Sequence, residues 1–416
     1  MKYGKFGLPT KVKFCKGCVL SNQKPNPTVE FFHTKKSKKA TTNIDEGNLC
    51  DGCKASQLKK QINWTARKDE LARLCDKHRS LDGSYDCIVP GSGGKDSIFA
   101  SLILKREFGM TPLTVTWAPH LYTDWGWQNH RAWVNAGIDN ILFSPNGRVH
   151  RLLTRLAFDN LLHPFQPFIV GQKATGPRFS ILYKIPLVFY GENPAEYGSP
   201  IAKFGNSMQD SKYFSLSSTE LYLSGCNIHD LQKKFDIGFG ELQPYLPLAK
   251  KDLQSAKTEV HYLGYYLKWH PQENYYYACK YSGFQAAPER TVGSYSKYSS
   301  IDDKIDDLHY WTSYIKFGLG RATYDAVQEI WNGDISREEG ISLVKQFDGE
   351  WPDRFMPEIC SYLSLPQNEF PNKISCKKNC LVTKKYLQEK ANKFRPPHLW
   401  KLTKSGFQLR YPIWEQ

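Results

Sequence analysis

The sequence predicts an α/β protein with a doubly wound parallel sheet, a small N-terminal cysteine module and a mainly helical C-terminal region. From Tyr85 onward, short apolar strands alternate with helical patterns, which is typical of parallel sheets. Two Cys-x-x-Cys pairs precede this alternation. Beyond residue 200 the alternation fades into Tyr- and Trp-rich and then helical segments. We therefore expect three parts, at 1–80, 81–250 and 251–416.

The composition fits a folded protein without a membrane span. The 416 residues are 40% hydrophobic and 14% aromatic, which is enough to bury a large core. We find no run of about 18 apolar residues, so no transmembrane helix is expected. The N-terminal segment "MKYGKFGLPTKVKFCKGC" has no apolar core of a secretory signal. The expected compartment is therefore the cytoplasm.

The net charge of +15 is concentrated at the two ends of the chain. Residues 1–80 hold 18 Lys and Arg against 7 Asp and Glu, and residues 371–416 hold 11 against 2. Basic ends suit nucleic acid, an acidic membrane surface, an anionic small substrate or an acidic partner protein. A solvated basic surface explains them equally well.

Eleven cysteines in a chain without a secretory signal do not indicate a disulfide framework. Cys15 and Cys18 form one Cys-x-Gly-Cys pair, and Cys50 and Cys53 form another. Two such pairs favour a structural Zn²⁺ held by four thiolates, with an iron–sulfur cluster or free thiols as alternatives. Such a site leaves no open coordination position, so it would support the fold. Free or packed thiols are expected at the other cysteines, namely Cys75, Cys87, Cys226, Cys279, Cys360, Cys376 and Cys380.

The elements of the middle part follow one another in a regular order. The expected strands are 85–89, 113–118, 140–145, 167–172 and 185–193, and the expected helices are 96–110, 129–138 and 149–162. Pro90 comes directly after these residues, and a proline, which has no N–H, is tolerated at the last position of a strand. Ligands of parallel sheets bind at the carboxyl ends of the strands, where "GSGGKDS", "TWAPH" and "YGEN" occur.

The stretch "CIVPGSGGKDS" (Cys87–Ser97) is neither a Walker loop nor a dinucleotide fingerprint, because Val89 and Asp96 stand where those motifs need other residues. Its Ser-Gly-Gly-x-Asp-Ser core resembles the pyrophosphate loop of ATP pyrophosphatases. Glycines let the backbone approach an anion, and the helix that follows presents its positive end. Asp96 is explained by a bound Mg²⁺ or by hydrogen bonds across the loop. The residues expected to bind ATP are Ser92, Gly93, Gly94, Lys95, Asp96 and Ser97.

Nearly the whole chain resembles the N-acetyl sugar amidotransferases of bacterial surface-polysaccharide pathways (WbpG/PseA-like). The matching phrases include "CKGCVLSNQKPNP", "IPLVFYGENPAEYG", "KWHPQENYYYA", "YSKYSSIDDKIDDLHYW", "IKFGLGRATYDAVQEI" and "ISREEGISLVKQFDGEWP". The second half carries more weight than the loop, because its phrases are not general to ATP pyrophosphatases. Gly91, where we would expect an apolar residue, is a minor departure.

The resemblance implies a ligase that converts an acetamido group of a nucleotide-activated sugar into an acetamidino group, for lipopolysaccharide O-antigen or a similar polymer. ATP would transfer AMP to the amide oxygen, and ammonia would then displace AMP. The chain has no N-terminal nucleophilic cysteine or cysteine elbow. The resemblance therefore also implies a separate glutaminase subunit, similar to that of histidine biosynthesis. Nucleic acid is not an expected partner.

Further site residues are open to two interpretations each. Glu192 and Asn193 could ligate Mg²⁺ or orient ammonia, or could simply be polar strand ends. Lys316 and Arg321 could neutralise phosphates or stabilise departing AMP, or could lie on a helix surface. The run Tyr275–Tyr277 suits sugar stacking or alternate packing in a strand. His120 and His130 have no identifiable partner. The last group could bind a metal or a partner but fits a solvated acidic face better: Asp302, Asp303, Asp306 and Asp307.

Two other functions compete with the amidotransferase. A tRNA-modifying ATP pyrophosphatase of the thiolase kind with a zinc module would explain the basic ends. Such sulfur transfer generally uses paired cysteines in the nucleotide domain, where only Cys87 and Cys226 occur. A non-catalytic scaffold for a glutaminase would not need the complete loop from Ser92 to Ser97. The amidotransferase is therefore the interpretation that the sequence favours.

Overall fold

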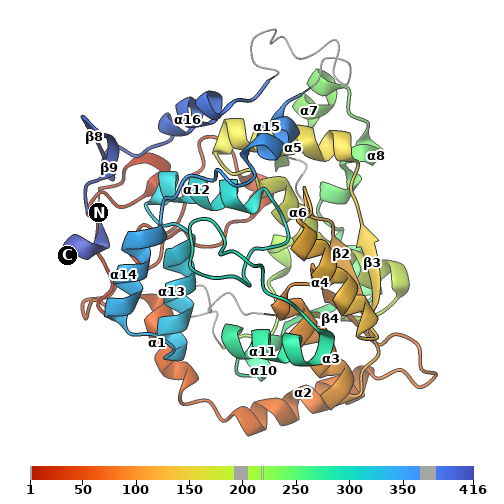
Figure 1. Cartoon of the computed structure of the whole chain (residues 1–416). Coiled ribbons are helices and arrows are strands. Elements are labelled where there is room, and N and C mark those ends of the chain that lie inside the picture. The colour runs from red at the N-terminus through yellow and green to blue at the C-terminus, as the bar shows by residue number, and fades with distance from the viewer. Residues whose placement is uncertain (1, 192–204, 217, 219, 366–380) are drawn as a thin grey trace.

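The computed structural model describes residues 2–191, 205–216, 218, 220–365 and 381–416. Its main sheet has five parallel strands in the order β3-β2-β1-β4-β7 (Figure 1). The order reverses between β1 and β4, and the crevice at such a switch point is where ligands of parallel sheets bind. The strands are β1 (Cys87–Pro90), β2 (Pro112–Trp117), β3 (Asp139–Phe143), β4 (Leu187–Tyr190) and β7 (Glu259–Tyr262).

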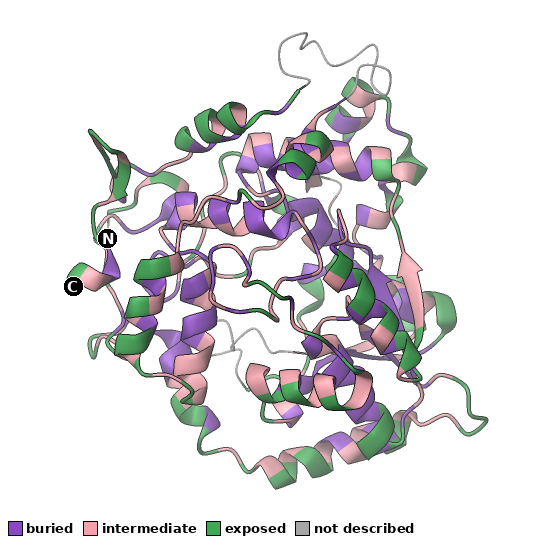
Figure 2. Ribbon diagram, viewed as in Figure 1, coloured by how far each residue is buried: buried purple, intermediate pink, exposed green. Residues whose placement is uncertain are grey.

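Helices cover both faces of this sheet. Successive strand residues point to opposite faces, so Val89 and Ile88 belong to different cores. α3 (Lys95–Phe108) packs Phe99 into the core that contains Val89, and α6 (Gln166–Tyr183) packs Phe179 into the core that contains Ile88. The strands between these helices are largely buried (Figure 2). The expected α/β class with a parallel sheet is confirmed.

Two expectations about the sheet need correction or extension. Residues 167–172 were expected to form a strand, but they lie in the first turns of α6. A short apolar run fits a buried helix as well as a buried strand, and Gly171 lets this helix pack closely, since a Cβ there would lie 2.3 Å from the ring of Trp117. The fifth strand, β7, comes after residue 250, where we expected the α/β part to end.

The other elements surround the sheet and fill the C-terminal part. In the described chain they include α1 (Asp51–Lys59), α2 (Trp64–His78), α4 (Asp124–Asn135), α5 (Gly147–Leu161), α7 (Ile228–Phe235), α8 (Phe239–Leu242), α9 (Lys250–Ser255), α10 (Leu263–Tyr266), α11 (Pro271–Ser282), α12 (Asp306–Phe317), α13 (Arg321–Asn332), α14 (Arg337–Phe347), α15 (Met356–Leu363) and α16 (Lys384–Asn392). Two short antiparallel pairs accompany them, β5 (Tyr222–Leu223) with β6 (Cys226–Asn227) and β8 (Trp400–Thr403) with β9 (Gly406–Leu409). None of the helices in these ranges is long and apolar enough to cross a bilayer.

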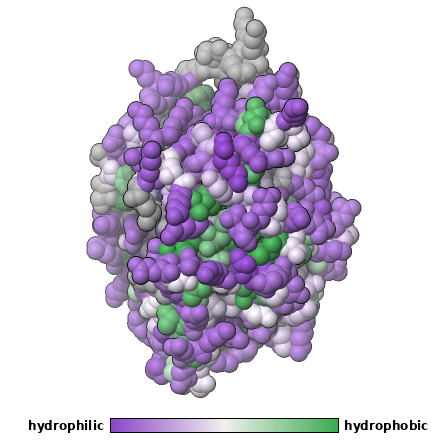
Figure 3. All heavy atoms as spheres, turned by 90° about the vertical axis from the view of Figure 1, so that its left-hand side faces the viewer, coloured by the Kyte–Doolittle hydropathy of each residue, from purple (hydrophilic) through white to green (hydrophobic). Residues whose placement is uncertain are grey.

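The N-terminal module packs on the C-terminal helices (Figure 1). Cys15 and Cys18 share a core with Ala326 of α13 and Val344 of α14. Both chain termini lie at this side of the molecule, whose surface is mostly hydrophilic (Figure 3). α14 begins with a capping box in the stretch "DISREEG". Ser336 Oγ accepts a hydrogen bond from the Glu339 N–H, and the Glu339 carboxylate accepts one from the Ser336 N–H. Segments far apart in the sequence thus form one body beside the sheet.

Candidate active site

A cavity of ≈ 750 Å³ is lined by residues from all three parts of the chain. Its first side is the loop after β1, and its second is formed by Tyr190 and Gly191 at the end of β4 and Tyr262 at the end of β7. These strand ends flank the switch point of the sheet. A cavity in this place is where a parallel sheet binds a nucleotide.

The loop after β1 is closely packed and depends on its glycines. A Cβ at Gly91 would lie 2.1 Å from the Cβ of Ser97, which explains why this position has no apolar residue. Gly93 has φ +87°, and a Cβ there would lie 2.9 Å from the backbone of His130. The Gly93 N–H donates to Ser97 Oγ at 3.2 Å, and Ser97 Oγ donates to the Gly94 carbonyl at 3.0 Å. The loop therefore enters α3 with its backbone fixed, and the positive end of the helix faces the cavity.

Asp96 is held by two neighbours. Its Oδ2 pairs with the Lys95 ammonium, and its Oδ1 accepts a hydrogen bond of 3.0 Å from Asn274 of α11. Neither contact crosses the loop, because Lys95 is adjacent in sequence and Asn274 lies on α11, so the two explanations that the sequence left open for Asp96 both remain predictions. Lys95 is buried, whereas the Asp96 side chain is 30% exposed. A partly exposed carboxylate with spare lone pairs retains the capacity to bind Mg²⁺ together with phosphate oxygens.

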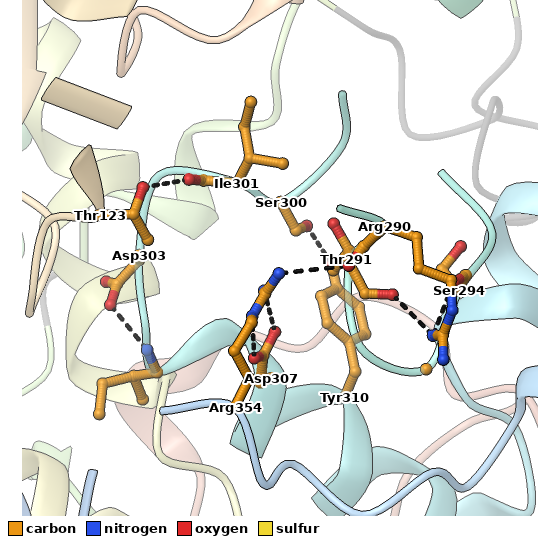
Figure 4. Close-up of polar contacts among 12 residues, drawn as sticks. Thr123, Arg290, Thr291, Ser294, Ser300, Ile301, Asp303, Asp307, Tyr310 and Arg354 are labelled. Atoms are coloured by element: carbon orange, nitrogen blue, oxygen red, sulfur yellow. Dashed lines mark hydrogen bonds and ion pairs between the residues drawn. The ribbon is translucent and has the colours of Figure 1, made fainter. Parts of the chain in front are cut away.

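The third side of the cavity includes part of the segment between α11 and α12. Polar contacts fix this segment at both ends (Figure 4). Thr123 donates its hydroxyl to the Ile301 carbonyl, and Asp303 accepts from the Ile305 N–H at 2.9 Å. Arg354 donates to the Arg290 carbonyl at 3.2 Å. The cavity-lining residues Tyr298, Ser299, Ser300, Ile301 and Asp302 are thereby held against the glycine loop.

The four aspartates of this region do not form a solvated face, so that expectation was wrong. Asp303 is buried and pairs with Nδ1 of His120 at 2.7 Å. Asp307 is buried and pairs with Arg354 at 3.1 Å, yet burial still raises its pKa to about 6. Burial also raises the pKa of Asp302 and of Asp306. Only Asp302 of the four lines the cavity, and no group of three acidic side chains in the described ranges has metal-binding geometry.

Lys316 is buried in the cavity wall, and the Arg321 side chain there is 14% exposed, so neither lies on an open helix surface. Lys316 donates to the Leu161 carbonyl at 2.7 Å, and burial, reinforced by Lys39, lowers its pKa to about 7. Arg321 forms an ion pair of 2.9 Å with Asp325. Arg321 is thus already neutralised, whereas Lys316 is a buried amine whose only hydrogen bond in the described structure is to a carbonyl.

No pattern in the sequence indicated that the N-terminal module reaches this cavity. Lys24, Glu30 and Lys39 line it, together with His163 and His309. Lys39 belongs to the basic stretch "HTKKSKKATTN", so its charge was visible, but its neighbours were not. Charge alone does not identify a binding residue, because most basic stretches are solvated.

Other predicted residues lie elsewhere. Glu192, Asn193, Cys376 and Cys380 fall outside the described residues. Tyr275–Tyr277 belong to α11 and not to a strand, and none of the three lines the cavity. Tyr275 stacks on Tyr298 at 4.3 Å between ring centroids, and Tyr277 meets Phe99 edge-on. These tyrosines therefore serve helix packing, although Tyr298, which one of them supports, does line the cavity.

The four N-terminal cysteines converge on one buried point. Their sulfur atoms lie within 4.8 Å of one another, with 3.6 Å from Cys15 to Cys53 and from Cys18 to Cys50. Tetrahedral zinc with Zn–S bonds of about 2.3 Å requires sulfur separations of about 3.8 Å. The Trp331 indole of α13 donates to Cys53 Sγ at 3.2 Å. The cluster can therefore bind a metal ion such as zinc, and its surroundings connect that ion to the C-terminal helices.

The C-terminal part of the chain is similar to a known protein family. Residues 292–412 match the family model described as "LPS biosynthesis protein WbpG-like, C-terminal domain". This match supports the WbpG-like resemblance and indicates a role in lipopolysaccharide biosynthesis. The matched range contains Lys316, Arg321 and the segment from Tyr298 to Asp302, so it supplies much of the third side of the cavity.

A second similarity is more limited. The chain is 36% identical over 83 residues to an uncharacterized protein of Methanocaldococcus jannaschii. The aligned stretch makes up 20% of this chain and 29% of that protein, so the chain spans less than a third of the relative.

Proposed function

We propose that the chain is an ATP-dependent, AMP-forming amidotransferase that acts on an acetamido group of a nucleotide-activated sugar. The product is an acetamidino sugar for a surface polysaccharide. ATP binds at Ser92–Ser97, and a separate glutaminase supplies ammonia. The observation that carries this proposal is that one cavity contains both the glycine loop and a wall from the WbpG-like region.

The chemistry requires that an amide, which is a poor electrophile, be activated. The amide oxygen attacks the α-phosphorus of ATP, an O–P bond forms and pyrophosphate leaves. Ammonia then attacks the carbon of the resulting imidate, the C–O bond breaks and AMP leaves with that oxygen. The amide N–H proton is released to solvent when the neutral imidate forms, and the amidinium product keeps the three protons of ammonia. Mg²⁺ would offset the charge of the phosphates when it is bound.

The residues of the chain contribute binding and orientation to these steps. The N–H groups at the start of α3 and the hydroxyls of Ser92 and Ser97 face departing pyrophosphate. Lys95 carries a positive charge beside them and Asp96 is its counter-ion. The segment from Tyr298 to Asp302 closes the cavity from the opposite side and so limits water access to the imidate.

The tRNA-modifying alternative is disfavoured by the positions of the cysteines. Sulfur transfer needs a reactive thiolate near the nucleotide. No described cysteine lines the cavity. Burial raises the pKa of Cys87 well above its ordinary value, and burial likewise raises that of Cys226. Thiols with raised pKa values are poor nucleophiles at neutral pH.

The proposal is tested by measuring AMP and pyrophosphate release from ATP with ammonium chloride as the nitrogen source. Di-N-acetylated sugar nucleotides are compared with bulk tRNA, and the acceptors are analysed by mass spectrometry. We expect release only with a sugar nucleotide, whose mass falls by the difference between O and NH. Release that depends on tRNA and leaves the sugars unchanged would refute the proposal. A Ser97→Ala variant, which loses two hydrogen bonds within the loop, is the control for loop-dependent catalysis.

A further inference from the structure

Five cavity-lining residues from distant segments converge beside α12, and we name them the lysine–histidine subsite. They are Glu30, Lys39, His163, His309 and Lys316. His163 and His309 stack with 5.1 Å between ring centroids. Lys316 interacts electrostatically with both histidines and with Glu30 and Lys39. The subsite is therefore one electrostatic unit at the cavity wall, contributed by the N-terminal module, the α5–α6 connection and α12.

The subsite contains two lysines and two histidines but a single carboxylate, that of Glu30. Oε2 of Glu30 lies 2.7 Å from Nδ1 of His33, and Oε1 of Glu30 lies 3.9 Å from the ammonium of Lys39. Lys316 has no carboxylate within 4.0 Å in the described parts of the chain, and its side chain is almost fully buried. His309 Nδ1 is buried without a hydrogen-bond partner among the described residues. Buried cations and unpaired ring nitrogens are costly unless a ligand pairs with them.

We propose that the lysine–histidine subsite binds the phosphate groups of the activated sugar, apart from the loop at Ser92–Ser97 that takes ATP. This inference rests on the proposed function for the identity of the ligand. Lys39 and Lys316 supply positive charge to the phosphates, and the His309 ring forms a hydrogen bond with a phosphate oxygen. Arg321 does not take this part, because Asp325 already neutralises it. A carboxylate on the sugar has the same anionic oxygens, and the experiment separates the two sources.

An anion in this subsite changes the protonation of Lys316. Its pKa is lowered to about 7 by burial and by the charges of Lys39 and Lys5, while Glu30 acts in the opposite direction. His33, His163 and His309 also face it, but burial lowers the pKa of each, so they are neutral above pH 7. A bound anion stabilises the ammonium, raises its pKa and so draws a proton from solution.

The test is calorimetric titration of the full-length, zinc-loaded chain at pH 8 with a nucleoside diphosphate. A non-hydrolysable ATP analogue fills the loop first, and two buffers with different ionisation heats report proton uptake. We expect binding with uptake of a fraction of a proton. In Lys316→Met, affinity falls by about 10- to 100-fold and the uptake disappears. Lys60→Met, an exposed lysine of the same module, leaves both unchanged.

Other outcomes show whether the subsite binds a phosphate or a sugar carboxylate, and whether Lys316 contributes to binding. Binding of glucuronate but not of the diphosphate assigns the subsite to a sugar carboxylate and overturns the phosphate proposal. Unchanged affinity and proton uptake in Lys316→Met also overturn it. If Lys316→Met does not fold, Lys39→Met provides the same affinity test from the N-terminal module, where the Lys39 side chain lines the cavity and is 9% exposed. Because these titrations need no turnover, they remain valid if the amidation assay fails, and normal amidation by Lys316→Met would refute the subsite alone.

Discussion

The two sides of the cavity are built in different ways. The glycine loop is local: its serines, glycines and aspartate lie within seven consecutive residues that join β1 to α3. The opposite wall is assembled from the N-terminal module, the α5–α6 connection and the C-terminal helices. A local loop can be shared by enzymes with many acceptors, since in the proposed reaction it contacts only ATP. We therefore expect acceptor specificity to depend on the assembled wall, and this difference can be tested by damaging each side separately.

Removal of the metal should have the largest effect and should act on the assembled wall. Binding of structural zinc contributes about 10–16 kcal/mol in small zinc modules, as much as the whole stability of a typical domain. A Cys50→Ser variant should lose zinc, measured by mass spectrometry, and lose acceptor-dependent AMP release. ATP binding to the sheet should persist. Cys360→Ser, at an isolated and half-buried thiol, should retain metal and activity. Loss of ATP binding together with zinc would mean that the two sides do not form separately.

A Gly93→Ala substitution damages the local side instead. Both Gly93 (φ +87°) and Gly83 (φ +80°) have left-handed backbones, which cost an alanine about 1–2 kcal/mol. Only at Gly93 would the new Cβ meet backbone, at 2.9 Å from His130. We expect Gly93→Ala to lower AMP formation about 100-fold through misplaced loop atoms. Gly83→Ala, whose Cβ meets nothing within 4 Å, should lose stability alone. Equal activity losses would contradict a role for loop geometry.

Arg321 tests whether a wall residue is structural or binds ligand. It pairs with Asp325 at 2.9 Å inside the wall, so Arg321→Met leaves a buried carboxylate unpaired. We expect a loss of about 3–5 kcal/mol in the free energy of unfolding, measured with urea. The double variant with Asp325→Asn should recover much of this loss. If the single variant is stable but binds the sugar nucleotide poorly, Arg321 contacts the ligand and the pairing argument is wrong.

The smallest effect concerns a charge at the edge of the same wall. Burial raises the pKa of Glu329 on α13 to about 7, and the ordinary value in an unfolded chain is about 4.3. At pH values between these two pKa values, Glu329 is protonated in the native state and ionised in the unfolded state. The free energy of unfolding therefore falls as the pH rises through this range. Glu329→Gln should raise the melting temperature at pH 8 but not at pH 4. An equal shift at both pH values would contradict the raised pKa.

The contrast between the local glycine loop and the assembled wall also explains which features could be predicted from the sequence. The strand, loop and helix around Cys87–Ser97 and the two Cys-x-Gly-Cys pairs follow from short spacings, which local stereochemistry constrains. The helical segment at 167–172 was mistaken for a strand because a short apolar run fits either. Asp303 was taken as solvated because its partner, His120, is remote in sequence. Lys39 and Lys316 interact electrostatically only because the N-terminal module packs near α12, and no local sequence pattern encodes that packing.

The most direct measurement follows the acetamido oxygen of the acceptor. A sugar nucleotide that carries a heavy oxygen isotope in this group is converted in the presence of ATP and ammonium, and AMP is analysed by mass spectrometry. If the cavity places the amide oxygen against the α-phosphate, the label appears in AMP and the amidine contains none. Unlabelled AMP, with the label retained in the sugar or found in pyrophosphate, would contradict activation of the acceptor at the glycine loop.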